Sequence, residues 1–110
     1  MGNCFGEFDD DFNDLIIEFN PIINNKTYYD DPFILPAEEN MITFGDLKEK
    51  LLDYSTTNEN FNDFAIFTKK DNTKWKKRSS RKYTNFDFDQ VKLLNKKTQT
   101  KFKFDVDINV

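Results

Sequence analysis

The chain has 110 residues, of which 37% are hydrophobic and 33% charged, and its formal net charge is −4. This length predicts one domain, because two halves would each bury too little apolar surface to offset the entropy of ordering. Histidine is absent and a single cysteine is present. The composition therefore excludes an internal disulfide and removes the residue most used for general acid-base chemistry and metal binding. We expect a non-enzymatic protein without a cofactor or a metal.

The charges are distributed unevenly along the chain. Residues 1–68 hold 15 acidic and 3 basic residues, a net charge of −12, whereas residues 69–110 hold 13 basic and 5 acidic residues, a net charge of +8. Thirteen Phe, four Tyr and one Trp concentrate the apolar surface in large side chains, which favours one modest core.

The first residues, Met1-Gly2-Asn3-Cys4, are typical of an acylation signal. Removal of Met1 exposes the Gly2 amine for myristoylation, and palmitoylation of Cys4 would add the second acyl chain that stable anchoring needs. Gly6 departs from the preferred Ser or Thr at the sixth position, so an unmodified terminus stays the alternative. No run of about 18 apolar residues predicts a spanning helix, and no apolar segment follows Cys4 as in a secretory signal. We expect a peripheral protein on the cytosolic face of a membrane.

Residues 1–13 are predicted to form a flexible acidic tether, and residues 14–110 the folded domain. Part of the tether matches a calcium loop, since Asp9, Asp11 and Asn13 have the spacing of the first three ligands. Asp14 stands where that loop needs glycine, and Asn20 where it needs a bidentate glutamate. We therefore interpret these residues as a solvated tether.

The first elements of the domain are predicted to be strands. Leu15 to Phe19 is a short apolar segment stopped by Asn20-Pro21, and Asn24-Asn25-Lys26 supplies a turn. A returning strand follows at residues 27–29 and 33–35, interrupted at Asp30-Asp31-Pro32.

A helix is predicted next. Thr43 is a candidate N-cap, Asp46 occupies the third helical position, and Ile42 is placed to contact Leu47. An apolar stripe over about three turns indicates that the helix packs on a sheet. The stripe comprises Phe44, Leu47, Leu51 and Tyr54.

Three further segments complete the domain. Residues 64–67 predict a strand, residues 69–73 a hairpin turn, and the following residues a strand that carries Trp75. Residues 86–94 are expected to include a short helical turn. The last strand alternates, with Phe102, Phe104, Val106, Ile108 and Val110 on one face and Lys101, Lys103, Asp105, Asp107 and Asn109 on the other.

The order of these elements resembles the ubiquitin-like β-grasp fold over residues 14–110. Ile42 to Leu51 resembles the capped helix of that family, residues 64–67 the strand that follows it, and residues 86–94 the short helical turn before the last strand. The resemblance implies an α+β fold in which a mixed sheet of four to five strands packs on one main helix. It also implies a module that binds protein partners. The final residues, Ile108-Asn109-Val110, lack the terminal glycine pair of conjugated members, so we do not expect a covalent modifier.

A basic cluster occupies a stretch of 14 residues on the predicted hairpin. It comprises Lys69, Lys70, Lys74, Lys76, Lys77, Arg78, Arg81 and Lys82. Such a cluster can contact an anionic membrane or an acidic protein, or it can form a solvated face. Nucleic acid is a weaker interpretation because the whole chain is acidic. Phosphorylation of Ser79 or Ser80, which lie between Arg78 and Arg81, would weaken an attraction to anions.

Two functions remain open from these patterns. The first is a membrane-tethered adaptor or scaffold that presents a protein-binding ubiquitin-like domain. The alternative is a structural subunit of a large intracellular assembly, cytoskeletal or ciliary, that docks through its acidic and basic faces.

Overall fold

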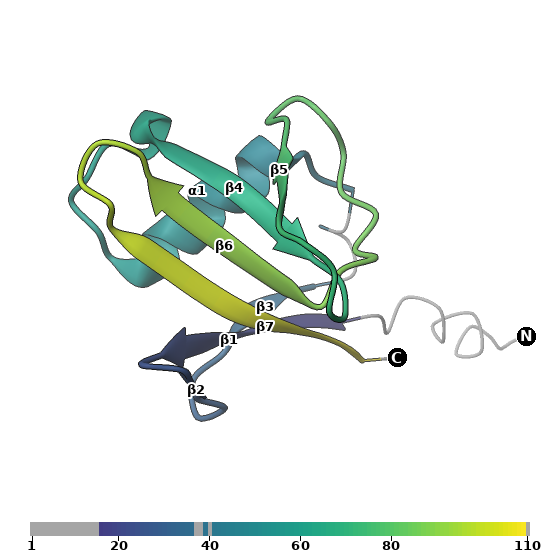
Figure 1. The fold of residues 1–110 in the computed structure, drawn as a ribbon. Coiled ribbons are helices and arrows are strands. Elements are labelled where there is room, and N and C mark those ends of the chain that lie inside the picture. The colour runs from purple at the N-terminus through teal and green to yellow at the C-terminus, as the bar shows by residue number, and fades with distance from the viewer. Residues whose placement is uncertain (1–15, 37–38, 40, 110) are drawn as a thin grey trace, which may run out of the picture.

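The computed structural model describes residues 16–36, 39 and 41–109, and these residues form an α+β fold (Figure 1). Among the described elements, the α-helix α1 (Phe44–Ser55) and the 3-10 turn η3 (Phe61–Asp63) accompany a single sheet of seven strands. The strands are β1 (Ile16–Ile23), β2 (Lys26–Thr27), β3 (Phe33–Leu35), β4 (Phe64–Lys69), β5 (Lys76–Arg78), β6 (Gln90–Asn95) and β7 (Lys101–Asn109).

The sheet has the strand order β2-β1-β7-β6-β4-β5, and β3 pairs with β1 beside β2. Figure 1 shows α1 behind the sheet, so one face of the sheet packs on the helix. Every strand pairing is antiparallel. The prediction of an α+β fold with one main helix is confirmed, but the prediction of a mixed sheet of four to five strands is wrong. Short hairpins join β1 to β2, β4 to β5 and β6 to β7, and a hairpin can join only antiparallel strands.

Strand β1 continues through Pro21 to Ile23, whereas the sequence predicts that it stops at Asn20-Pro21. The carbonyl oxygen of Pro21 accepts a hydrogen bond from the N–H of Tyr28 at 2.9 Å. The N–H and C=O of one residue point to the same side of a strand, so the missing N–H of Pro21 also faces away from β7. Proline therefore removes no bond between β1 and β7. The predicted turn is confirmed, with Asn24 and Asn25 at φ of 54° and 66°.

Residues 86–94 contain no helical turn, which corrects the sequence prediction. Thr84, Phe86 and Phe88 are buried in a segment without regular secondary structure that leads into β6, where Val91 and Leu93 are buried. Burial repeats every second residue from 84 to 88 and again from 91 to 93, which is the period of a strand, and it shifts by one residue between the two stretches. The backbone of Phe86 has a φ of 54°, a local bend before β6.

Helix α1 begins as predicted. Thr43 is the N-cap, and its Oγ1 accepts a hydrogen bond from the N–H of Asp46 at 3.1 Å. Leu47 and Leu51 are fully buried against the sheet. The helix ends at Ser55, followed by Thr56 in the left-handed conformation.

The core lies between α1 and one face of the sheet. Its most buried large side chains include Phe19, Leu35, Leu47, Ile66 and Phe104. The last strand follows its predicted alternation through Val106, but Ile108 is 45% exposed, and Val110 lies outside the described residues. The predicted hairpin turn is confirmed by the hydrogen bond from Thr73 N–H to the carbonyl oxygen of Lys70, at 3.0 Å. Trp75 precedes β5 rather than lying within it.

Candidate functional site

The face of the sheet opposite α1 carries a row of side chains that crosses four strands. Lys77 on β5 is opposite Phe67 on β4, Phe67 is opposite Lys92 on β6, and Lys92 is opposite Lys103 on β7. Residues directly opposite in antiparallel strands project from the same face. Cationic side chains thus flank an aromatic ring along one line of the sheet.

Trp75 lies over this row, in contact with cations from three strands. Its ring centroid is 4.6 Å from Lys92 Nζ, 5.6 Å from Lys69 Nζ and 5.9 Å from Lys103 Nζ. Lys92 Nζ is also 5.0 Å from the ring centroid of Phe67. Each distance lies within the range of a cation–π contact. We call this surface the basic face; it comprises Phe67, Lys69, Trp75, Lys77, Lys92 and Lys103.

The cations of the basic face repel one another. Burial lowers the pKa of Lys92, and the positive charges of Lys101, Lys103 and Lys69 lower it further. The nearby side chain of Lys96 lowers the pKa of Lys77. A bound anion would relieve this repulsion, because an opposite charge favours the charged form of each lysine.

The cations of the basic face have no acidic partners within the described part of the chain. The ion pairs formed among the described residues join Lys50 to Glu39 at 3.0 Å and Lys97 to Asp63 at 3.4 Å. Among the described residues, therefore, no carboxylate forms an ion pair with the lysines around Trp75.

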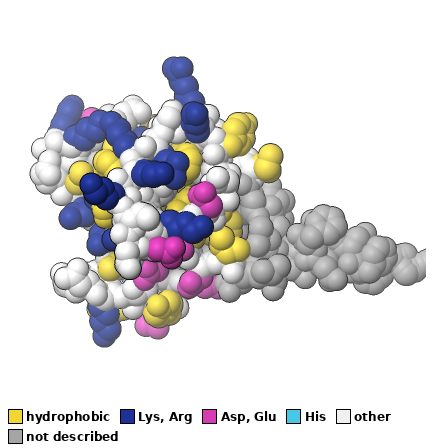
Figure 2. Space-filling view, turned by 45° about the vertical axis from the view of Figure 1, so that its right-hand side comes forward, with side chains coloured by type: hydrophobic (Ala, Val, Ile, Leu, Met, Phe, Trp, Pro, Cys, Tyr) yellow, Lys and Arg dark blue, Asp and Glu magenta, His cyan; other side chains and the backbone are white. Residues whose placement is uncertain are grey.

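Acidic side chains lie on the same face of the sheet, toward β1. Asp105 accepts hydrogen bonds from Thr27 Oγ1 and, at 2.9 Å, from Gln90 Nε2, while Asp107 accepts one from Asn20 Nδ2 at 3.1 Å. Figure 2 shows Lys and Arg side chains over the upper part of the molecule and acidic side chains gathered below them. The face is therefore basic over β4–β6 and acidic over β1 and the end of β7.

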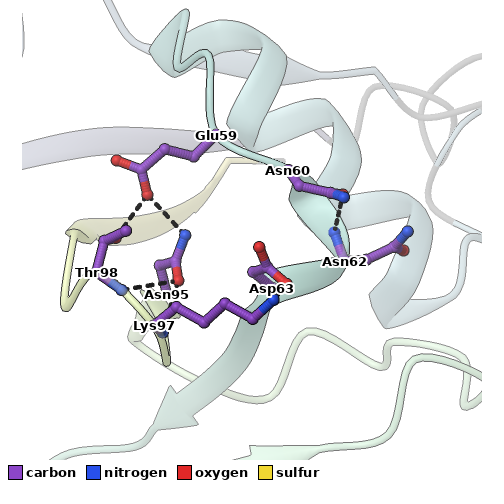
Figure 3. Close-up of polar contacts among 7 residues, drawn as sticks. All are labelled: Glu59, Asn60, Asn62, Asp63, Asn95, Lys97 and Thr98. Atoms are coloured by element: carbon purple, nitrogen blue, oxygen red, sulfur yellow. Dashed lines mark hydrogen bonds and ion pairs between the residues drawn. The ribbon is translucent and has the colours of Figure 1, made fainter.

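A polar cluster positions the loop between β6 and β7 (Figure 3). The carboxylate of Glu59 accepts hydrogen bonds from Asn95 Nδ2 at 2.6 Å, Thr98 Oγ1 at 2.7 Å and Thr100 Oγ1 at 2.8 Å. Asn95 Oδ1 accepts from the N–H of Lys97 at 2.8 Å. These bonds fix the loop that follows Lys92 and precedes Lys103.

The structure divides the basic cluster that the sequence predicts as one surface. Lys69 and Lys77 lie on the basic face, whereas Arg78 points to the helix side, where its Nε donates to Thr68 Oγ1 at 2.8 Å. Lys76 is exposed at the start of β5, opposite Thr68, and the remaining cations lie on the loops on either side of β5, at the edge of the sheet: Lys70, Lys74, Arg81 and Lys82. Ser79 and Ser80 are exposed in the loop after β5.

Sequence reasoning missed Phe67, Lys92 and Lys103 as members of the site. The signal was present for Lys103, because the alternation of the last strand places it opposite the apolar face. Lys92 lies in the segment wrongly assigned a helical turn, so its face was not predicted.

Some predicted features fall elsewhere. Gly2 and Cys4 lie outside the described residues, as do Asp9, Asp11 and Asn13 of the calcium-like pattern. Within the part of the chain that the structure describes, no group of three or more Asp, Glu, His or Cys side chains is placed to hold a metal ion.

Fold and site together define an α+β protein in which one helix covers an antiparallel sheet and the opposite face presents lysines around a tryptophan. Comparison of the chain with protein-family models, with curated proteins and with solved structures found no match. Among the described residues, no helix is both long enough and apolar enough to span a membrane.

Proposed function

We propose that this protein is a non-enzymatic, membrane-tethered adaptor that binds an acidic segment of a protein partner through the basic face. The observation that carries the proposal is the set of three lysine ammonium groups around Trp75, none of which has an ion-pair partner in the described chain. Acyl chains on Gly2 and Cys4 supply the tether.

A simple solvated surface accounts less well for this arrangement. Isolated lysines on a sheet extend into water, where their charges are screened. Here Lys92 and Lys103 converge on one indole ring, and Lys92 is partly desolvated between Trp75 and Phe67. An acidic segment that carries an apolar side chain would satisfy both the charges and the exposed part of the ring.

We further propose that the fold is related to the ubiquitin-like β-grasp class. The order of strands around α1 supports this relationship. The antiparallel pairing of β1 with β7 counts against this relationship. The β-grasp resemblance implies a mixed sheet, which contains at least one parallel pair of strands.

Fluorescence of Trp75, the only tryptophan, tests the binding surface directly. We expect poly-glutamate to change the Trp75 emission of the full-length chain at low ionic strength. The double variant Lys92→Gln/Lys103→Gln should bind roughly tenfold more weakly, since each exposed ionic contact contributes up to about 1 kcal/mol. The matched control Lys50→Gln/Lys97→Gln removes the same charge from lysines that are paired with Glu39 and Asp63.

Equal weakening by both double variants would reduce the effect to net charge and would overturn the basic face as a site. A single-stranded oligonucleotide that binds more tightly than poly-glutamate would replace the acidic protein with nucleic acid as the partner.

The tether has its own test in eukaryotic cells that contain myristoyltransferase. We expect the intact mass to rise by one myristoyl group on Gly2, and we expect the chain to pellet with membranes. Gly2→Ala should abolish both, whereas Cys4→Ser should keep the myristoyl mass and pellet weakly, because one acyl chain gives only marginal binding. An unmodified Gly2 in the soluble fraction would eliminate the tether.

The alternative, a structural subunit of a cytoskeletal or ciliary assembly, is favoured by one observation. Acidic and basic regions lie side by side on the face opposite α1, as an assembly with neighbouring subunits would use. Co-sedimentation with a detergent-insoluble fraction that Gly2→Ala leaves unchanged would favour this function over the adaptor.

A further inference from the structure

A second cationic site lies at the edge of the sheet, on the helix side of β5. A pocket of about 410 Å³ is lined by Arg78, Ser79, Lys82, Tyr83 and Asn85 over the buried ring of Phe44. We call it the edge pocket. Lys77 contributes to its rim but projects from the basic face, opposite Phe67, so Arg78 and Lys82 are the cations that define the pocket.

Arg78 is held in a defined orientation. Its Nε donates to Thr68 Oγ1 at 2.8 Å, and its guanidinium carbon lies 5.5 Å from the centroid of the Phe44 ring. No carboxylate of the described residues forms an ion pair with it. The two terminal nitrogens of the guanidinium therefore remain available, and their planar fork matches two oxygens of a phosphate.

The wall of the edge pocket is fixed to the start of α1. The N–H of Phe44 donates to the carbonyl oxygen of Lys82 at 2.8 Å, and the N–H of Gly45 donates to that of Ser80 at 3.0 Å. A Cβ on residue 45 would lie 3.0 Å from the same Ser80 oxygen, so glycine permits this close approach. The loop of residues 79–82 is thus ordered before any ligand binds, which lowers the entropy cost of binding.

The electrostatics of this position favour an anion. The start of α1 is the positive end of the helix dipole, and it lies against the loop that carries Lys82. Its first N–H groups are already used by Lys82 and Ser80, so the helix contributes potential rather than direct hydrogen bonds. Ser79 Oγ and the Asn85 side chain are polar groups at the rim, and Tyr83 is 65% exposed beside them.

We propose that the edge pocket binds a phosphate monoester, with Arg78 and Lys82 on the phosphate oxygens and Tyr83 against the organic group. This inference does not depend on the basic face, because Arg78 projects from the opposite side of the sheet. The phosphate can belong to a phosphorylated lipid headgroup or to a soluble phosphate ester. The Ser79 hydroxyl lies at the same site, so a phosphate on Ser79 would compete with the ligand.

Backbone amide NMR of the full-length chain tests the proposal, with inorganic phosphate and phosphoserine as probes and chloride at matched ionic strength as the reference. We expect saturable shifts in the residue 78–85 amides. Arg78→Lys should weaken binding roughly tenfold, because lysine lacks the bidentate fork. Lys82→Gln changes an exposed side chain and should also weaken binding in a folded chain.

Two controls separate this site from the basic face and from net charge. Lys92→Gln/Lys103→Gln and Lys97→Gln should both retain phosphate binding. If shifts at residues 78–85 are absent, or equal those produced by chloride, or survive unchanged in Lys82→Gln and Arg78→Lys, the edge pocket is not a phosphate site. Vesicles that contain a phosphoinositide, compared with vesicles of phosphatidylserine and with free inositol phosphate, then distinguish the lipid source from the soluble one.

Discussion

At the scale of single residues, Glu59 shows how one carboxylate organises two loops. It receives hydrogen bonds from three side chains of the β6–β7 segment, and the bonds from Thr98, Thr100 and Asn95 lower its pKa against the opposing effect of burial. A carboxyl group whose pKa is lower in the folded state than in the unfolded state stabilises the fold above its unfolded pKa. That stabilisation is lost as the pH falls through the folded pKa.

Replacement of Glu59 tests this link between its pKa and the stability of the fold. At pH 7, Glu59→Gln should lower the melting temperature, because a neutral amide accepts weaker hydrogen bonds than a carboxylate. The difference from the parent chain should shrink below about pH 4, where unfolded glutamate is protonated. Thermal unfolding at several pH values measures this difference in melting temperature. Glu49→Gln, on the exposed side of α1, is the control. A difference that stays constant from pH 7 to pH 3 would assign the effect to packing rather than to charge.

Lys48 illustrates a charged residue that occupies a core-facing position of a helix. It lies on α1, only 7% exposed, and its Nζ donates to the carbonyl oxygen of Phe64 at 3.0 Å. Burial, and then the charge of Lys96, lowers its pKa. The ammonium also lies 5.6 Å from the ring of Phe61 in η3. Position 48 lies on the core-facing stripe of α1 together with Phe44 and Leu51, so helical spacing explains its burial, and the carbonyl of Phe64 and the ring of Phe61 explain how a lysine is accommodated there.

At the scale of elements, the sequence predicts an element well where the signals are local. Helix α1 begins where Thr43 and Asp46 indicate, since a cap depends on residues three positions apart. The β1–β2 turn follows from Asn24-Asn25, because asparagine tolerates the positive φ that a two-residue hairpin needs. These features require no knowledge of the rest of the chain.

Elements whose form depends on distant partners were predicted less well. In the sequence, Pro21 predicts the end of a strand because proline lacks an N–H. In the structure the position of that missing N–H faces away from β7, so β1 continues, and only the strand pairing shows this. Residues 86–94 alternate in two runs, Phe86 to Asp89 and Val91 to Leu93, whose apolar positions are out of phase by one residue, and β6 forms over the second run, where β4 and β7 flank it.

The candidate site shows the same division. The run of cations between Lys69 and Lys82 was evident, but strand alternation sends Lys77 and Arg78 to opposite sides of β5. Lys92 and Lys103 are distant in sequence from Trp75, and the order of strands brings them to it. Charge was therefore predictable, whereas its division into a basic face and an edge pocket was not.

At the scale of the whole molecule, β7 joins the two halves of the sheet. On one side it pairs with β1, which carries β2 and β3, and on the other it pairs with β6, which leads to β4 and β5. Trp75 and the basic face belong largely to the second half. A partner that binds there therefore depends on β7 for the stability of its docking surface.

The last prediction tests whether the two halves unfold as one. Phe104 is 1% exposed at the centre of β7, opposite Pro21 and Val91, and its ring centroid lies 6.1 Å from that of Tyr54 on α1. Phe104→Ala should cost about 3–5 kcal/mol of unfolding free energy. Urea unfolding followed by Trp75 fluorescence and by far-UV circular dichroism should show coincident midpoints, both shifted down. Ile108→Ala, at an exposed position of the same strand, should shift them much less. A Trp75 transition that stays at its parent midpoint while the dichroism midpoint falls would mean that the β4–β6 half folds independently of β7.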